Sequence, residues 1–256
     1  HIECSAMAEK HLGKTIDIHA GGQDLVFPHH ENEMAQSTCA HDGAAFANYW
    51  LHNGFLSMDR EKMSKSLGNV LLVHELVERI PGEVMRLALL SAHYRQPLDW
   101  SDDTVDAARK MLDRLYGAVR GIEVSDAARA AASPPEALID ALEDDLNTPK
   151  AMAEFFALAK SLNKATDDDT REALAAQMYA SGELMGLLAS DPEDWFVGGD
   201  GDDAGVQALI DERAAAKRER NFARADAIRD QLTAQGIAIE DGPDGTTWRR
   251  IREADE

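Results

Sequence analysis

Residues 15–22 read Thr15-Ile16-Asp17-Ile18-His19-Ala20-Gly21-Gly22, and this stretch decides the fold class of the first part of the chain. Its two isoleucines alternate with polar residues, which predicts a short strand, and the glycines after them predict a tight turn. Pro28 can take the first position of a helix that runs to Cys39. Tyr49-Trp50-Leu51-His52 predicts another strand. This order of strand, glycine turn, helix and strand is typical of an α/β fold.

Beyond Glu83 the hydrophobic pattern becomes helical. The clearest case is a predicted helix over 102–120, whose apolar residues recur three and four positions apart. These residues are Val105, Ala108, Leu112, Leu115 and Val119. Further helices are predicted over 84–94, from a capped start at Ser133-Pro134-Pro135-Glu136, from Thr148-Pro149, and over 170–189. Together they predict an antiparallel helical bundle over 83–190.

The end of the chain predicts a linker and a small module. Residues 191–204 hold acids and glycines but no Lys or Arg, so we expect a flexible linker there. Two helices are predicted over 206–220 and 222–234. Strands over 237–240 and 246–250 follow, and the Asp-Gly-Pro-Asp-Gly stretch between them predicts a hairpin with a five-residue turn. The expected domains are therefore 1–55 (α/β), 56–82 (a connecting loop region), 83–190 (the bundle) and 205–256 (the module).

Composition excludes several classes of protein. The chain has 256 residues with 26 Lys and Arg against 47 Asp and Glu, a formal net charge of −21, so it is not a basic nucleic-acid coat protein. It has no apolar run of about 18 residues that could span a membrane. Its two cysteines favour a reducing compartment, and we expect a cytoplasmic monomer. The chain opens at His1 without a Met, which we interpret as a piece of a longer protein.

The stretch Lys62-Met63-Ser64-Lys65-Ser66 has two readings. It is either an ordinary solvated basic loop or a mobile clamp on a polyphosphate, in which lysines neutralise charge that grows in the transition state. A loop would let both lysines close after the substrate enters.

This stretch is similar to the signature loop of class I aminoacyl-tRNA synthetases. Three further blocks, residues 1–7, 21–25 and 27–33, resemble cysteinyl-tRNA synthetases, and the resemblance covers essentially all 256 residues. It implies that residues 1–55 are the second half of a Rossmann-type catalytic domain. It also implies that the first ATP motif of the family and one zinc-binding cysteine would lie upstream of His1. A chain without them is expected to be inactive by itself.

The resemblance implies a reaction and the residues that serve it. Cysteine would react with ATP, as its Mg²⁺ complex, to give cysteinyl-adenylate and pyrophosphate, and would then pass to tRNA(Cys). Lys62 and Lys65 would be catalytic. The implied ATP-binding residues are Gly21, Gly22, Asp24, Lys62, Met63, Ser64, Lys65 and Ser66. Asp24 would accept hydrogen bonds from the ribose hydroxyls.

Cys4, His29 and Glu33 are the implied zinc ligands. On residue spacing alone the case is weak: His29 and Glu33 lie i, i+4 on one predicted helix, and His30 competes for the same role. The resemblance favours His29. Zinc binds a thiolate strongly, so it would select cysteine over serine, which a shaped pocket alone separates by only about 1–3 kcal/mol. His1, His19 and His30 would line the substrate pocket, and we expect Cys39 to be a core residue.

The basic residues near the end of the chain predict contacts with tRNA. Residues 211–229 carry six cations against four acids, and Trp248 stands beside Arg249 and Arg250. By composition alone, a salt-bridged helix pair with a packed Trp is the simpler reading. The resemblance places anticodon binding here, through Arg218, Arg220, Trp248 and Arg249, because unpaired bases are read by stacking and hydrogen bonding. Arg109, Lys110 and Arg114 of the bundle could contact the tRNA backbone.

Two alternatives remain at this point. A related family joins cysteine to an amino sugar with a similar zinc pocket and loop, and would have little need for residues 204–256. The chain could also be a tRNA-binding fragment without catalysis. An aminoacylation assay separates these alternatives from a cysteine–tRNA ligase.

Overall fold

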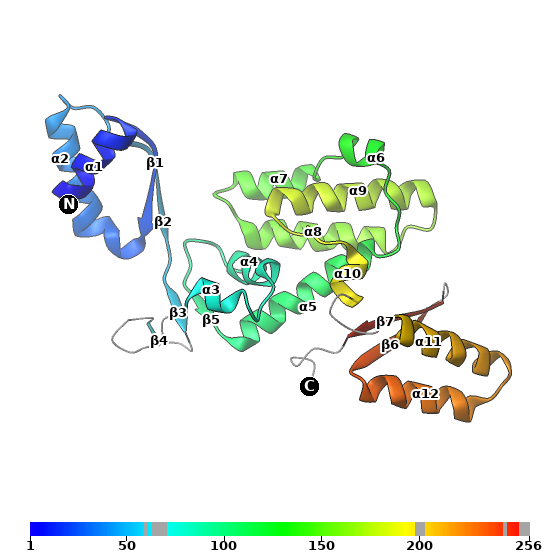
Figure 1. Cartoon of the computed structure of the whole chain (residues 1–256). Helices are drawn as coiled ribbons and strands as arrows, with labels where there is room; N and C mark the ends of the chain where they lie inside the picture. Colours follow the sequence, from blue (N-terminus) through cyan, green and yellow to red (C-terminus); the bar gives the residue numbers. More distant parts are fainter. Residues whose placement is uncertain (59–60, 63–70, 198–202, 243–244, 251–256) are drawn as a thin grey trace. The chain divides into compact units, whose positions relative to one another are not determined.

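The structure is a computed structural model that describes residues 1–58, 61–62, 71–197, 203–242 and 245–250. The chain divides into two compact units, each of which is discontinuous in sequence. The first comprises His1–Arg109 and Pro135–Phe155, and the second comprises Lys110–Pro134 and Phe156–Glu256 (Figure 1). Among the described residues, no helix has the length and apolar character needed to cross a membrane.

The first unit opens with a small α/β layer. Helix α1 (Ile2–Leu12) packs on α2 (Glu31–Ala40), and β1 (Ile16–Gly22) pairs in parallel with β2 (Ala47–Asn53). Ile16, Phe46 and Ala47 form a buried cluster, against which Ala8 and Trp50 pack. The predicted α/β character is confirmed, and helix α1 is an element that the sequence pattern did not indicate.

Gly21 and Gly22 are the last residues of β1, so the predicted tight turn at these positions is wrong. A Cβ atom on Gly21 would lie 2.7 Å from Cε1 of His30, so glycine is needed for the close approach of a side chain. The chain turns afterwards, through a 3₁₀ turn (Gln23–Leu25) and one turn of π-helix (Val26–His30), before α2 begins.

A second sheet follows in the order β4-β3-β5. Strand β3 (Leu56–Met58) runs antiparallel to β4 (Glu61–Lys62) and parallel to β5 (Leu98–Trp100). Helices α3 (Val73–Leu76) and α4 (Gly82–Leu90) lie between β4 and β5 in sequence. The backbone N–H of Gly54 donates to the carbonyl of Tyr94 over 2.7 Å, and a Cβ atom on Gly54 would lie 2.4 Å from the carbonyl oxygen of Gln96. This contact fixes the start of β3 beside the chain that leads into β5.

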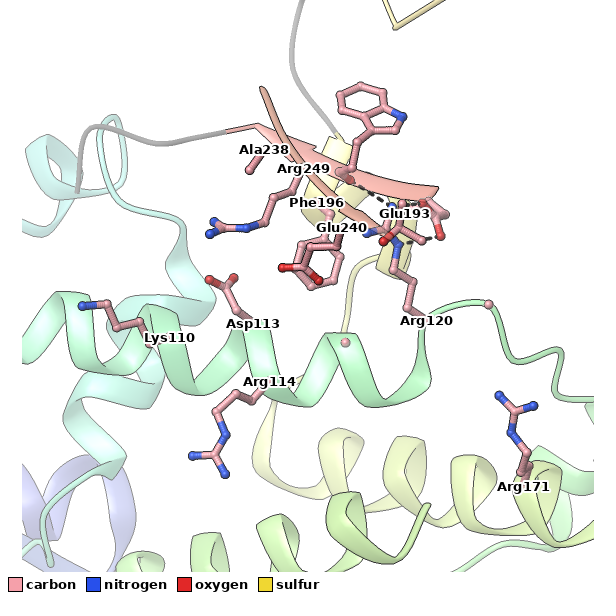
Figure 2. Close-up of a pocket in the computed structure, with 14 residues that line it drawn as sticks. Lys110, Asp113, Arg114, Arg120, Arg171, Glu193, Phe196, Ala238, Glu240 and Arg249 are labelled. Atoms are coloured by element: carbon pink, nitrogen blue, oxygen red, sulfur yellow. Dashed lines mark hydrogen bonds and ion pairs between the residues drawn. The ribbon is translucent and has the colours of Figure 1, made fainter. Parts of the chain in front are cut away.

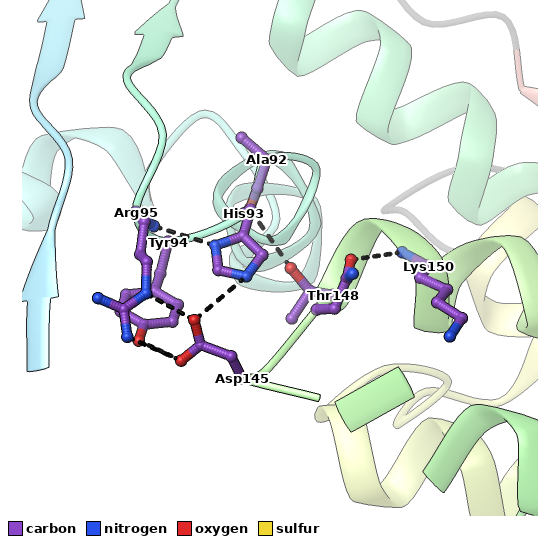
Figure 3. A network of polar contacts seen from close by, with 8 residues as sticks. Ala92, His93, Tyr94, Arg95, Asp145, Thr148 and Lys150 are labelled. Carbon is purple, nitrogen blue, oxygen red and sulfur yellow. Dashed lines mark hydrogen bonds and ion pairs between the residues drawn. The ribbon is translucent and has the colours of Figure 1, made fainter. Parts of the chain in front are cut away.

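Asp145 holds that same segment from the other side (Figure 3). Its carboxylate accepts a hydrogen bond from the Tyr94 hydroxyl over 2.7 Å and from Nε of Arg95 over 2.6 Å. The Thr148 hydroxyl donates to the carbonyl of Ala92 over 3.3 Å. Residues 92–95 are thereby tied to the loop that precedes α8.

Helix α5 (Asp102–Val119) buries the predicted stripe of apolar residues: Val105, Ala108, Leu112, Leu115 and Val119 are each at most 7% exposed. The predicted helix and its inner face are therefore confirmed. The other helices of the expected bundle are α6 (Asp126–Ala131), α7 (Glu136–Glu143), α8 (Thr148–Leu162) and α9 (Asp168–Met185).

Two predicted helix ends are wrong. Ser133 does not cap α7, which begins at Glu136 after Pro135 and has no side-chain cap. Ser125 and Asp167 cap α6 and α9 instead, since their side chains accept hydrogen bonds from backbone N–H groups three residues further along the chain. Helix α9 ends at Gly186, which adopts a left-handed conformation, so it stops short of the predicted residue 189.

The expected linker contains a helix, α10 (Pro192–Val197), in which Trp195 and Phe196 are buried. The indole Nε1 of Trp195 donates to Asp113 over 2.8 Å, and its ring stacks on Tyr116 at a centroid distance of 4.6 Å. The first half of this acidic stretch is therefore anchored by two aromatic side chains and is not a simple linker.

The C-terminal module is confirmed as a helix pair with a β-hairpin. It consists of α11 (Asp203–Arg218), α12 (Phe222–Ala234), β6 (Ile237–Gly242) and β7 (Gly245–Arg250), with β6 and β7 antiparallel. Its buried core is formed by Val206, Ile210, Ile228, Leu232, Ile237 and Trp248. Gly242 pairs with Gly245, so the turn is shorter than the predicted five residues.

Candidate functional site

The side chain of Glu33 lies at the centre of a histidine cluster in the first unit. Glu33 is on the first turn of α2 and is only 1% exposed. One carboxylate oxygen, Oε1, lies 2.7 Å from Nε2 of His29, one helical turn away. The other oxygen, Oε2, lies 3.0 Å from Nε2 of His19 on β1 but has no aligned hydrogen-bond donor among the described residues. A buried carboxylate oxygen without a donor is costly unless it is paired or coordinates a cation.

Two overlapping groups of side chains around Glu33 could hold a metal ion. The first is Cys4, His29 and Glu33, and the second is His19, His30 and Glu33; within each group the ligand atoms lie within 4.8 Å of one another. The structure thus brings together all three residues predicted as zinc ligands, from α1, the π-helical turn and α2. Because only the first group contains a thiol, it offers the mixed sulfur, nitrogen and oxygen ligands typical of zinc.

The three predicted pocket histidines all lie in this cluster. His1 Nδ1 is 2.8 Å from His29 Nδ1, and the rings of His19 and His30 meet edge to face at 4.6 Å between centroids. His30 is 5% exposed. Burial, and next the neighbouring His19, lower the pKa of His30, which favours the neutral imidazole that can accept a hydrogen bond or bind a metal.

His52 belongs to the cluster, although the sequence analysis gave it no role. Its Nε2 lies 2.8 Å from Nδ1 of His30, and the register of β1 and β2 places it opposite Gly21. The signal was present in the sequence: His19 and His52 each stand close to the end of a predicted strand. Parallel pairing of those strands brings the two residues to the same edge of the sheet.

The predicted nucleoside-binding residues adjoin the histidine cluster. Asp24 is exposed in the 3₁₀ turn directly after β1. A Cβ atom on Gly22 would lie 2.5 Å from Oδ1 of Asp24, so this glycine leaves room for the carboxylate. Gly21 lies against His30. The three residues are therefore placed together at the carboxyl end of β1, the edge at which α/β sheets commonly bind ligands.

Most of the predicted lysine loop lies outside the described residues. The backbone of Lys62 is described, in β4 and paired with Ser57 of β3. The Lys62 side chain and residues Met63, Ser64, Lys65 and Ser66 are not described. Their catalytic and ATP-binding roles remain predictions.

Cys39 is exposed, so the expectation that it is a core residue is wrong. It lies near the end of α2, whose buried residues are Glu33 and Ser37. This helix buries polar side chains on its inner face, so the general tendency of a free cysteine to be buried does not hold for Cys39.

Trp248 is 7% exposed and belongs to the core of the C-terminal module, so its predicted role in stacking on a base is not supported. Arg218 and Arg220 are exposed at the end of α11. Phe222, the first residue of α12, is 61% exposed beside them and was missed by the sequence analysis. An aromatic residue directly after a run of basic residues was the available signal.

Several cations of residues 211–229 are structural. Arg213, which is 4% exposed, donates two hydrogen bonds to Asp241, at 2.8 and 3.0 Å, and Lys217 contacts the same carboxylate at 2.7 Å. Arg224 pairs with Glu212 at 2.7 Å. The hydrogen bonds from Arg213 and Lys217 lower the pKa of Asp241. These residues fit the simpler reading of a salt-bridged module. For Arg218, Arg220 and Arg249 the contact with RNA stays a prediction.

Three family models match the chain. Residues 1–110 match the class I (C) tRNA synthetase catalytic domain, residues 137–189 the DALR domain, and residues 200–249 the cysteinyl-tRNA ligase anticodon binding domain. The match at 200–249 does not favour the amino-sugar ligase, because that alternative leaves this module without a purpose.

Curated relatives carry the name cysteine–tRNA ligase. A relative from Parvibaculum lavamentivorans is 58% identical over 97% of this chain and 54% of its own length. One from Xanthomonas campestris is 56% identical over 98% of this chain and 54% of its own length. The chain thus spans about half the length of these relatives.

A solved structure of LeuRS from Agrobacterium radiobacter K84, in a ternary complex with tRNA and LeuAMS, matches with a TM-score of 0.53. It is 17% identical and covers 73% of this chain and 28% of the LeuRS chain. At this identity the likeness concerns the fold alone.

Proposed function

Because the chain belongs to the cysteine–tRNA ligase family, we propose that it serves the ATP-dependent ligation of cysteine to tRNA(Cys), with a zinc ion that selects the substrate thiolate. The observation that supports this most directly is the buried Oε2 of Glu33, which has no hydrogen-bond donor among the described residues, although Cys4, His29 and His19 offer ligand atoms close to the Glu33 carboxylate. We further propose that the protein is a cytoplasmic monomer.

Cys4, His29 and Glu33 would hold the zinc ion, which supplies a Lewis acid that favours the thiolate form of bound cysteine. Cys4 would be deprotonated when it binds, and His29 would bind through one ring nitrogen while the other contacts His1. Glu33 would bind through one carboxylate oxygen, and its two oxygens lie 3.0 Å from Nε2 of His19 and 2.7 Å from Nε2 of His29. Serine would be rejected because its hydroxyl is a poor metal ligand.

The remaining histidines would shape the pocket. His19 and His30 pack on Trp50 with ring centroids 4.9 and 5.4 Å apart. This leaves their polar edges toward the cluster, where they would orient the metal ligands and the amino acid. His30 would do so as the neutral imidazole.

ATP would bind beside this pocket, with Gly21 and Gly22 in backbone contact with the nucleoside and Asp24 accepting hydrogen bonds from the ribose. In the first step a carboxylate oxygen of cysteine attacks the α-phosphorus of ATP, and pyrophosphate leaves as Mg²⁺ and the lysines Lys62 and Lys65 neutralise its charge. Met63, Ser64 and Ser66 would complete that loop. In the second step a hydroxyl of the tRNA 3′ end attacks the adenylate carbonyl, and AMP leaves.

The second unit would bind tRNA through Arg218, Arg220 and Arg249, with Phe222 as an exposed aromatic surface for a base. The alternative that the chain only binds tRNA, without catalysis, is less well supported, because it assigns no function to the cluster of side chains around Glu33. Since the chain spans about half of its relatives, we expect no cysteine activation from these 256 residues alone.

The test is aminoacylation by a chimaera in which residues 1–256 replace the matching part of the Parvibaculum lavamentivorans relative. We expect the chimaera to charge tRNA(Cys) with cysteine and not with serine. The same chimaera with Lys65→Ala should lose most of this activity while keeping its thermal midpoint. A folded chimaera without cysteine-dependent charging would contradict the proposal.

A further inference from the structure

The carboxylate of Asp145 joins parts of the chain that match two different family models. Asp145 lies within residues 137–189, which match the DALR domain, whereas its partners Tyr94 and Arg95 lie within residues 1–110, which match the catalytic domain. All of them belong to the first compact unit. The catalytic part of the chain is thus held at this point by a residue from outside it.

Asp145 holds its two partners with both carboxylate oxygens (Figure 3). Oδ1 accepts hydrogen bonds from the Tyr94 hydroxyl over 2.7 Å and from Nη2 of Arg95 over 3.0 Å, and Oδ2 accepts one from Nε of Arg95 over 2.6 Å. The guanidinium also lies 5.0 Å from the centroid of the Tyr94 ring. A two-point pair between an arginine and a carboxylate fixes orientation as well as distance. Asp145 therefore sets the directions of both side chains.

Asp145 and Leu146 form a corner whose backbone conformation is energetically costly. Their φ angles are 56° and 54°, in the left-handed region that residues other than glycine rarely occupy. Leu146 is 49% exposed, so packing of its side chain does not hold the corner in place. Such a conformation persists where surrounding contacts over-determine it. Here the side-chain contacts that do so are the hydrogen bonds of Asp145 and the one from Thr148 to the carbonyl of Ala92.

The backbone that follows Tyr94 lies against the start of β3. The carbonyl of Tyr94 accepts a hydrogen bond from the N–H of Gly54 over 2.7 Å, and a Cβ atom on Gly54 would collide with the carbonyl oxygen of Gln96. Because glycine brings the two backbones into direct contact, no gap is left to absorb a shift of residues 94–96. Such a shift would move the start of β3.

Strand β3 connects this segment to the strand that leads into the lysine loop, residues 62–66. It pairs with β5 on one side and with β4 on the other, so that Ser57 stands opposite both Asp99 and Lys62. The Ser57 hydroxyl also donates to the Asp99 carboxylate over 2.5 Å. Strand β4 ends at Lys62, and residues 63–66 follow it directly in sequence. A change in the position of β5 would therefore be carried to the backbone of Lys62.

We propose that Asp145 is a positioning residue for the adenylate step: it sets the place of β5, and through β3 the place from which the lysine loop begins. The proposal rests on the proposed function, because it assumes that Lys62 and Lys65 neutralise the leaving pyrophosphate. It requires a residue of the DALR domain to matter before any tRNA is bound, since cysteine activation needs only cysteine and ATP. A misplacement of about 1 Å can cost about a hundredfold in rate, so the effect is measurable.

The first measurement is hydrogen exchange of the 256-residue chain, which does not depend on catalysis. Asp145→Asn introduces a residue that tolerates the left-handed backbone but leaves a single acceptor oxygen for Tyr94 and Arg95. We expect the backbone amides of residues 54–58 and 94–100 to exchange about three- to fivefold faster, the upper part of the range for exposed ion pairs. Unchanged exchange would overturn the inference whatever reaction the chain serves.

The second measurement is cysteine-dependent pyrophosphate exchange without tRNA, by the chimaera with the Parvibaculum lavamentivorans relative. Asp145→Asn should lower kcat about 10- to 100-fold and leave KM for cysteine unchanged, because the cluster around Glu33 keeps all its side chains. Arg95→Gln should have the same effect. The double variant should be no slower than either single variant, because both changes remove one contact. Additive losses, or a wild-type kcat in Asp145→Asn, would overturn the proposal.

The matched control is Glu193→Gln in the second unit. Glu193 accepts two hydrogen bonds from Arg120, at 2.8 and 2.6 Å, so it holds an arginine in the same two-point manner (Figure 2). Its loss should lower the thermal midpoint but change neither the exchange of residues 54–58 nor kcat. If it slows kcat as much as Asp145→Asn does, the effect is one of general stability and the inference fails. A folded wild-type chimaera that activates no cysteine would instead overturn the proposed function.

Discussion

Glu33 is the residue on which the candidate metal centre depends. It is shared by both possible ligand groups, and it is the only one of their members that is almost completely buried with an oxygen that lacks a donor within the described ranges. Burial of a carboxylate next to imidazoles is stable only if a cation or proton compensates its charge. The proposed zinc ion would meet that requirement, and the thiol of Cys4 would then be one of its ligands.

Replacing Glu33 with Gln should therefore weaken zinc binding strongly. The amide keeps the size of the side chain but is a far poorer ligand for zinc, so we expect a loss of affinity of more than about 100-fold, beyond that typical of residues that only support the ligands. Competition with a chelator at fixed pH measures it. Glu31→Gln, an exposed change on the same turn of α2, is the control. Equal zinc affinity in the two variants would remove Glu33 from the site.

At the scale of secondary structure, the contacts of Asp145 join the segment before β5 to the loop before α8. The hydrogen bonds from Arg95 and then from Tyr94 lower the pKa of Asp145 from 3.8 to about 2. In the same segment, the carbonyl of Tyr94 accepts a hydrogen bond from the N–H of Gly54. Strand β5 pairs with β3, and β3 also pairs with β4, which contains Lys62. Asp145 thus helps to place the strand that leads into the lysine loop.

The lowered pKa predicts a pH dependence of stability. The ionised Asp145 contributes its full stabilisation above the unfolded-state pKa, and this is lost as the pH falls from about 4 to about 2. Asp145→Asn should therefore flatten the acid limb of a plot of urea midpoint against pH. Asp144→Asn, at the neighbouring position, should retain the wild-type slope. Identical profiles for Asp145→Asn and the wild type would contradict the assigned hydrogen bonds.

The same scale shows what sequence patterns can predict. The stripe on α5 and the limits of α12 were predictable because each apolar face is regular and each helix packs that face inward. Helix α1 was missed because Ile2, Met7 and Leu12 are exposed, so its apolar residues do not mark a buried face. Helix α10 was missed because six residues with two buried aromatics are too short to show a period.

At the scale of the whole molecule, residues that belong to a sequence motif were easier to predict than contacts between distant parts of the chain. The residues around Glu33 were identified from motifs, and His52 was not, because its role arises only when β1 and β2 pair. Trp248 was misread because sequence does not distinguish an aromatic residue in a small core from one on an RNA surface.

The net charge of −21 affects how the whole molecule would meet an RNA. A chain with this charge repels RNA on the whole, so the exposed cations Arg218 and Arg220 near the end of α11 would be the favoured points of approach under the proposed function.

The most direct test of the central claim, that the cluster around Glu33 holds a metal that recognises a thiol, is cobalt substitution followed by absorption spectroscopy. Cobalt(II) in the site should show a sulfur-to-metal charge-transfer band that Cys4→Ala abolishes and Cys39→Ala leaves intact. Added cysteine should strengthen the band, and added serine should not. A chain that binds no cobalt, or whose spectrum responds equally to cysteine and serine, would contradict the account.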